Sequence, residues 1–88
     1  MNDQLILFNI GMMTIFTMSG GNVGLACDAA RKWLKEQHQI QRPVCEVANH
    51  LYAGAKVIAG HTQALEFIEQ NKKDFGIRRT KRIPGKSK

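Results

Sequence analysis

The sequence predicts a small α+β domain, and three observations lead to this prediction. Runs of strand-forming residues alternate with two segments that have the apolar spacing of amphipathic helices. A chain of 88 residues is the size of one domain. Hydrophobic residues make up 43% of it and charged residues 23%, which is the composition of a folded protein. We therefore expect two helices to cover one face of a small antiparallel sheet.

The N-terminal region is predicted to form one or two strands. Residues 5–8 and 13–18 are rich in strand formers, and Gly11 between them marks a turn, a bulge or a kink. The apolar run is flanked by an acidic residue, Asp3, and is shorter than the ~20 residues that span a bilayer. It does not resemble a secretion signal either. We therefore expect a cytoplasmic protein that does not associate with membranes.

The first helix is predicted over residues 22–38. The turn residues Ser19, Gly20 and Gly21 precede it, and Asn22 is a typical N-cap residue. Its apolar residues recur at spacings of three and four: Ala26, Ala29, Ala30, Trp33 and Leu34. From this spacing, we expect Trp33 to be the main core anchor of the helix.

Residues 44–59 allow two interpretations. As a β-hairpin they would turn at Gly54, whereas as a helix they would continue to residue 71. We favour the hairpin because Gly54 and Gly60 would each cost a helix about 1 kcal/mol relative to alanine. The alternative is a strand–helix–helix chain, which would dimerise like a ribbon–helix–helix protein and insert its strands into the DNA major groove.

A second helix is predicted after Gly60, and Gly76 is typical of the residue just beyond a helix end. Apolar content falls sharply after Gly76, and Pro84 and Gly85 interrupt regular structure. We therefore divide the chain into a globular domain, residues 1–76, and a flexible basic tail, residues 77–88.

Positive charge is concentrated at the C-terminal end. Residues 72–88 carry eight basic residues and one acid, a net charge of +7, while residues 1–71 carry five basic and six acidic residues, a net charge of −1. A block of like charge seeks a polyanion, and each contacted phosphate releases a counterion. The predicted nucleic-acid-binding residues are Lys72, Lys73, Arg78, Arg79, Lys81, Arg82, Lys86 and Lys88, joined by Arg31, Lys32 and Lys35 on the exposed side of the first helix.

Other chemistry has little support in the sequence. The cysteines, Cys27 and Cys45, are too few for a disulfide scaffold, and neither belongs to a Cys-x-x-Cys pair. Nothing near either cysteine indicates an activated nucleophile. We therefore predict no catalytic residue, no cofactor and no metal, and expect that the protein is not an enzyme.

Two functional hypotheses follow. The first is a small nucleic-acid-binding regulator or accessory protein that contacts phosphates through its basic tail. The alternative is a binding inhibitor or adaptor of the phage or mobile-element type, such as an anti-CRISPR or host-takeover protein, that docks on a host protein or nucleoprotein complex. The expected partner is therefore nucleic acid or a nucleoprotein complex. A homodimer is compatible with so small a core.

Overall fold

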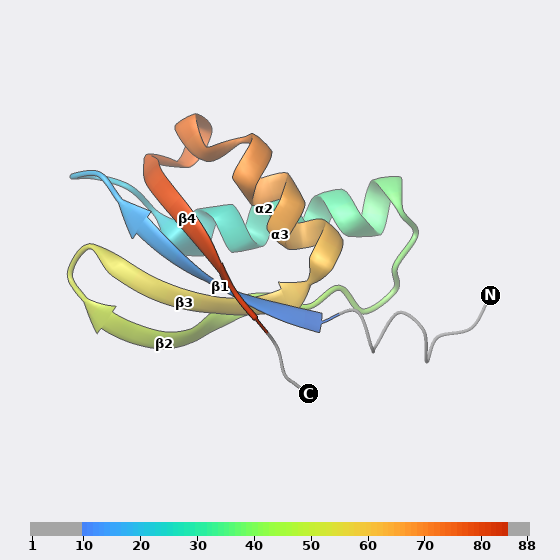
Figure 1. Ribbon diagram of the computed structural model, residues 1–88. Helices are drawn as coiled ribbons and strands as arrows, with labels where there is room; N and C mark the ends of the chain where they lie inside the picture. The colour runs from blue at the N-terminus through green and yellow to red at the C-terminus, as the bar shows by residue number, and fades with distance from the viewer. Residues whose placement is uncertain (1–9, 85–88) are drawn as a thin grey trace.

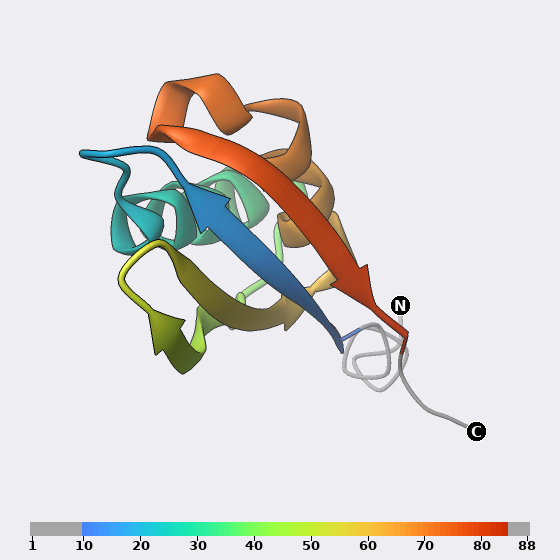
Figure 2. The same cartoon turned by 60° about the vertical axis from the view of Figure 1, so that its left-hand side comes forward.

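Four strands form one antiparallel sheet, and two helices pack on one of its faces (Figures 1 and 2). The structure is a computed structural model that describes residues 10–84 of the chain. Its elements in chain order are β1 (Ile10–Thr17), α2 (Val23–Gln37), β2 (Cys45–Tyr52), β3 (Ala55–His61), α3 (Thr62–Gln70), the 3₁₀ helix η1 (Lys72–Phe75) and β4 (Ile77–Ile83). The strand order is β2-β3-β1-β4. This β-α-β-β-α-β arrangement is the ferredoxin-like, or split βαβ, topology.

The α+β prediction is confirmed. The hairpin is confirmed as well, because β2 and β3 pair antiparallel on either side of a turn at Ala53 and Gly54. The ribbon–helix–helix alternative is wrong, since residues 45–61 are strands and not one long helix. The strand expected over residues 5–8 lies outside the described residues.

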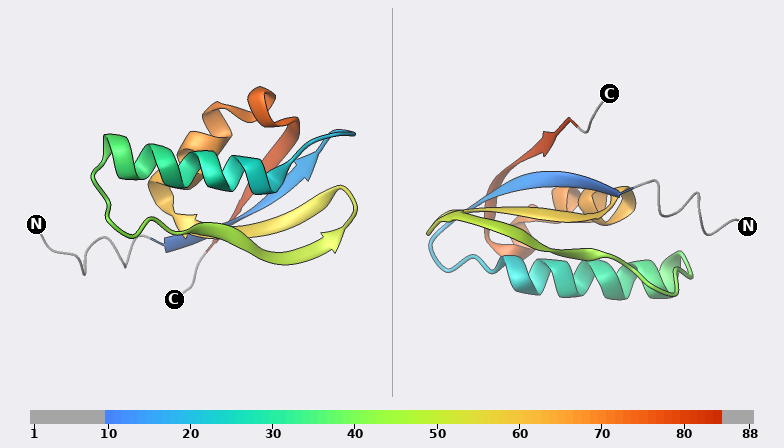
Figure 3. Two further views of the ribbon diagram at one scale, coloured as in Figure 1. Left: turned by 180° about the vertical axis from the view of Figure 1, so that it is seen from behind. Right: turned by 90° about the horizontal axis from the view of Figure 1, so that it is seen from below.

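Helix α2 begins where the sequence predicted. The Asn22 side chain accepts a hydrogen bond from the Leu25 backbone N–H at 3.0 Å, which satisfies one of the free donors of the first turn. The helix lies across the sheet, as the view from behind in Figure 3 shows. Its inward side chains join the core with Met13 and Ile15 of β1, Ile58 of β3 and Leu65 of α3.

Trp33 is not the main anchor of α2. Leu34, one residue further on, is fully buried, whereas Trp33 is only partly buried. The Trp33 ring lies at the margin of the core, stacked on Phe67 of α3 at 5.0 Å between centroids and in edge contact with His38 at 4.5 Å. A helix turns by about 100° per residue, so adjacent residues cannot share its central inward position.

The predicted tail is wrong for residues 77–83, which form strand β4. β4 pairs antiparallel with β1, from Met12 opposite Ile83 to Thr17 opposite Ile77. The sequence of β4 contains few apolar residues, and Ile77 is its one buried residue. The local sequence therefore did not indicate a strand. Pairing with β1 stabilises β4, because the backbone N–H and C=O groups of the two strands form hydrogen bonds with each other. Residues 85–88 of the predicted tail lie outside the described residues.

Close contact between two glycines sets where β4 begins. The Met18 N–H donates to the Gly76 carbonyl at 2.8 Å, and Gly76 has a left-handed backbone, with φ of +70°. A Cβ atom on Gly21 would lie 2.5 Å from the Gly76 oxygen. The two loops can therefore approach only because both residues lack side chains, and this approach places the first residues of β4 beside Phe16.

Candidate anion-binding surface

β4 carries four of the predicted basic residues, all exposed, and three of them form one group: Arg78, Arg79 and Lys81. The Cζ atom of Arg79 lies 4.5 Å from the centroid of the Phe16 ring, and that of Arg78 lies 5.9 Å from it. The β1–β4 register shifts between Phe16 and Thr17, so Arg78 is an additional residue in the strand and both guanidinium groups reach one ring. These contacts hold two long, exposed side chains against one aromatic ring.

Register places Arg79 and Lys81 on the sheet face that is opposite the helices. Met13 and Ile58 face each other across β1 and β3 and belong to the core beneath the helices. The alternate residues of each strand must therefore point to the other face, which we call the open face.

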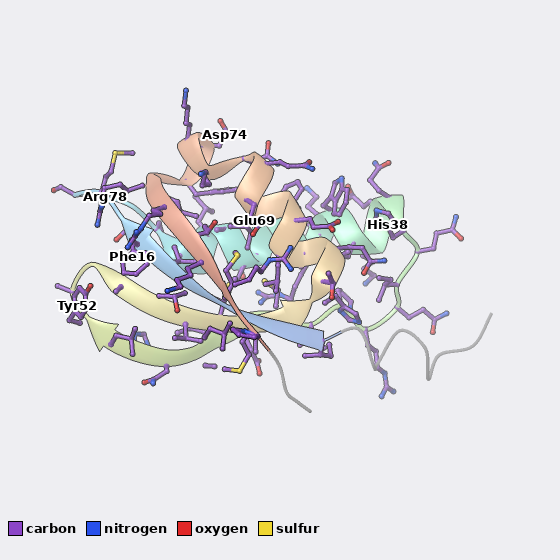
Figure 4. All side chains as sticks on the ribbon, in the orientation of Figure 1. Phe16, His38, Tyr52, Glu69, Asp74 and Arg78 are labelled. Atoms are coloured by element: carbon purple, nitrogen blue, oxygen red, sulfur yellow. The ribbon has the colours of Figure 1, made fainter. Side chains whose placement is uncertain are left out.

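The open face carries a row of four residues that crosses all four strands: Tyr52, Ala55, Phe16 and Arg79. Ala55 is only 1% exposed, whereas Tyr52 is 64% exposed. Two aromatic rings therefore stand on either side of a small, covered residue. Figure 4 shows Tyr52 at the β2–β3 turn, with Phe16 and Arg78 towards the same end of the sheet. We call these four residues the open-face row.

Arg82 belongs to the opposite face. Its Nε and Nη2 atoms donate to the two carboxylate oxygens of Glu69 on α3, at 2.9 and 3.1 Å. This bidentate contact uses the planar guanidinium group against the helix layer, so Arg82 is separated from Arg79 and Lys81. Lys72 and Lys73 lie in η1, before β4 begins. Lys86 and Lys88 are outside the described residues.

The three basic residues predicted on α2 do not join this surface, because α2 lies on the other side of the sheet. The Arg31 guanidinium donates to the Asp28 carboxylate and to the backbone carbonyl of Cys45, which ties the helix to β2. Lys32 and Lys35 are exposed on the same helix. The structure thus separates the predicted basic residues into a β4 group, a helix-facing arginine, an η1 pair and an α2 group.

Among the described residues, no carboxylate forms an ion pair with the β4 group, which consists of Arg78, Arg79 and Lys81. Within residues 10–84 the ion pairs are Arg31 with Asp28 and Arg82 with Glu69. Arg78, Arg79 and Lys81 therefore keep their charge available to an external anion.

The two cysteines contact each other inside the core. Cys27 on α2 and Cys45 at the start of β2 are both buried and unoxidised. The interaction between the two neighbouring thiols lowers the pKa of Cys27 and, together with burial, raises the pKa of Cys45. Burial keeps this pair away from any ligand at the surface.

His61 is the buried polar residue of the described core, at 1% exposure. Its Nδ1 atom accepts a hydrogen bond from the Val44 backbone N–H at 2.9 Å, so the proton of the neutral ring is on Nε2. Burial lowers the pKa of His61. This histidine therefore links the entry of β2 to the β3–α3 junction in its neutral form.

Two further observations concern the described residues. Among residues 10–84, no three His, Cys, Asp or Glu side chains come close enough together to hold a metal ion. Neither α2 nor α3 has the length and hydropathy of a helix that crosses a bilayer.

Sequence comparison relates the chain to enzymes of acyl transfer. A probable mitochondrial malonyl-CoA–acyl carrier protein transacylase of Drosophila melanogaster is 47% identical over 62 residues, which are 70% of this chain and 16% of that protein. The human mitochondrial malonyl-CoA–acyl carrier protein transacylase is 38% identical over 74 residues, 84% of this chain and 19% of that protein. The chain resembles one part of these transacylases. It spans less than a fifth of their length, and no protein-family model matches it.

Solved structures agree on the fold. A malonyl-CoA–acyl carrier protein transacylase from Coxiella burnetii superposes with a TM-score of 0.66 at 23% identity, over 88% of this chain and 22% of that chain. An acyl carrier protein S-malonyltransferase from Vibrio cholerae superposes with a TM-score of 0.67 at 24% identity, over 93% of this chain and 26% of that chain. The small α+β fold therefore occurs within longer malonyltransferase chains.

These relatives correct the functional predictions. The expectation of a nucleic-acid-binding regulator is wrong, and so is the alternative of a phage-type inhibitor or adaptor, because the relatives are transacylases by name. The expectation that the protein is not an enzyme is wrong for the same reason, because the relatives are named as transacylases. The expectation of a nucleic-acid or nucleoprotein partner is wrong as well. A basic segment indicates that a partner is anionic, but net charge cannot distinguish one phosphate-bearing partner from another.

Sequence reasoning missed the two aromatic members of the open-face row. Phe16 and Tyr52 lie in segments that were correctly predicted as strands, but their common face depends on the pairing of β1 and β2 with β3. One signal was present: Tyr52 is a large aromatic residue directly before the predicted hairpin turn at Gly54.

Proposed function

We propose that this chain forms the ferredoxin-like part of a malonyl-CoA–acyl carrier protein transacylase, where its basic open face contacts the anionic substrates. The observation that carries the proposal is the 47% identity with the Drosophila melanogaster protein over 62 residues. The human and mouse relatives, 38% and 36% identical over 74 residues, support the same assignment.

The proposed role is substrate contact, with the chemistry of acyl transfer supplied by the remainder of the enzyme. The matched region makes up 16–19% of the fly and human relatives, which supports a part that cooperates with a longer chain. Coenzyme A carries phosphates, so a surface with three unneutralised cations is suited to receive it. The relatives' names support a mitochondrial location in place of the predicted cytoplasmic one.

A graft into the human enzyme tests the proposal. The 74 matched residues of the human transacylase would be replaced by the corresponding residues of this chain, and transfer of malonyl from malonyl-CoA to acyl carrier protein would be measured. We expect the graft to retain transfer within about tenfold of the human enzyme, a change of about 1.4 kcal/mol in the barrier.

The matched control is the same graft with Ile77→Asp, which places a charge at a position that is 2% exposed. This control should lose both the native fold and transfer. A graft that folds normally by circular dichroism and shows no transfer would overturn the proposed function.

A further inference from the structure

We infer that the open-face row and Lys81 bind the adenine nucleotide part of coenzyme A, with the base on Tyr52 and the phosphates on the cations of β4. The choice of coenzyme A as ligand rests on the proposed function. The location and the chemistry of the site rest on the geometry of the open face.

The first support is the exposed ring of Tyr52. At 64% exposure it has the largest exposed fraction of the large hydrophobic residues described. Tyr52 follows two register irregularities in β2, between Val47 and Asn49 and between His50 and itself, so its strand is bent at this end. An exposed aromatic ring on a strand is a stacking surface for a nucleobase.

The second support is the preorganisation of the arginines. The Cζ atom of Arg79 lies 4.5 Å from the centroid of the Phe16 ring, and the Cζ atom of Arg78 lies 5.9 Å from it. The ring therefore restricts where both guanidinium groups can lie before a ligand arrives. A restrained guanidinium group loses less conformational entropy when it binds a phosphate, and it can donate two hydrogen bonds to it. Phe16 thus acts as a positioning residue for Arg79.

The third support is the spacing of the cations along β4. Arg79 pairs with Phe16 and Lys81 with Thr14, so the two cations point to the same face. They are two residues apart on an antiparallel strand, which separates them by about 7 Å. The nucleotide of coenzyme A bears a phosphate on the ribose and a pyrophosphate on the same sugar, and two cations at this spacing suit two anionic groups on one sugar.

The fourth support is the distance between base and phosphate positions. Tyr52 and Phe16 lie on β2 and β1, which are separated by β3, so their backbones are about 10 Å apart. Ala55 between them has a short side chain, so nothing larger separates the two rings. A nucleotide can then lie across the row, with its base at Tyr52 and its phosphates towards Arg79.

The test is a titration of the full chain observed through backbone amide chemical shifts. The probes are coenzyme A, adenosine 3′,5′-bisphosphate and pantetheine. We expect coenzyme A and the bisphosphate to shift the amides of β1, β4 and the β2–β3 turn, and pantetheine to shift none of them. Binding should weaken as salt concentration rises, because the phosphate contacts are at the surface.

Variants assign the roles. Arg79→Ala and Tyr52→Ala should each weaken coenzyme A binding about tenfold, whereas Tyr52→Phe, which keeps the ring, should bind like the parent. Arg42→Ala is the matched control, because Arg42 is an exposed arginine in the segment between α2 and β2, at the other end of the molecule from the β2–β3 turn. It should leave binding unchanged.

Four results would overturn the inference. The first two are that coenzyme A does not bind, or that pantetheine binds as tightly as coenzyme A. The third is that Arg42→Ala weakens coenzyme A binding as much as Arg79→Ala does. The fourth is that Arg79→Ala weakens binding of acyl carrier protein and leaves binding of coenzyme A unchanged. None of these measurements uses transacylase activity, so a failed graft leaves the titration informative, and a failed titration leaves the graft assay informative.

Discussion

Truncating Ile77 to alanine tests whether β4 is part of the fold. Ile77 is 2% exposed and opens β4, the strand whose sequence resembles a tail. The change removes three buried carbons at about 0.8 kcal/mol each, or about 2.4 kcal/mol. Any cavity that does not collapse raises the cost, within the range of about 2–5 kcal/mol for such substitutions. The matched control is Ile83→Ala at the other end of the strand, where the side chain is 38% exposed and the cost should stay below about 1.5 kcal/mol.

Thermal and urea unfolding, followed by far-ultraviolet circular dichroism, measure both variants. In a domain of this size each 1 kcal/mol lowers Tm by about 4–8 °C, so Ile77→Ala should melt about 10–20 °C below the parent. Ile83→Ala should remain much closer to it. If the two variants are destabilised equally, within about 0.5 kcal/mol, then residue 77 is not in the core and β4 does not belong to the folded sheet.

Three further predictions concern the core. Because burial lowers the pKa of His61 in the folded state, the unfolded chain binds its proton first as the pH falls. The free energy of unfolding should therefore decline as the pH falls below about 6.5, the ordinary pKa of histidine. Urea unfolding repeated across pH measures this decline, which should be smaller in His61→Gln. Gly60→Ala should destabilise the protein by about 1–3 kcal/mol, because the new Cβ atom would lie 2.5 Å from the Val44 carbonyl oxygen. Gly54→Ala should be close to neutral in the same assay, because its Cβ atom would lie 3.8 Å from the nearest atom. Cys27 and Cys45 should react with a thiol reagent only as fast as the chain opens, since both are buried, and rapid labelling of the native protein would contradict the packing of α2 on β2.

Local sequence patterns determined the parts of the fold whose signals lie within a few residues. Asn22 ends a turn and caps α2, and its side chain makes the predicted type of bond to the Leu25 N–H. Gly54 marks the hairpin turn, because glycine disfavours the competing helix and suits the turn. The concentration of positive charge in residues 72–88 was also evident from composition.

The tertiary structure decided what those patterns could not. β4 is a strand because β1 offers it hydrogen-bonding partners, although just one of its seven side chains is buried. Arg79 and Arg82 look equivalent in sequence, yet the pleat turns Arg79 to Phe16 on the open face and Arg82 to Glu69 beneath α3. The open-face row joins residues 16, 52, 55 and 79, which come together only when four strands pair in one register. Pairing between distant segments has no local signal, because its free energy comes from partners that the neighbouring sequence does not contain.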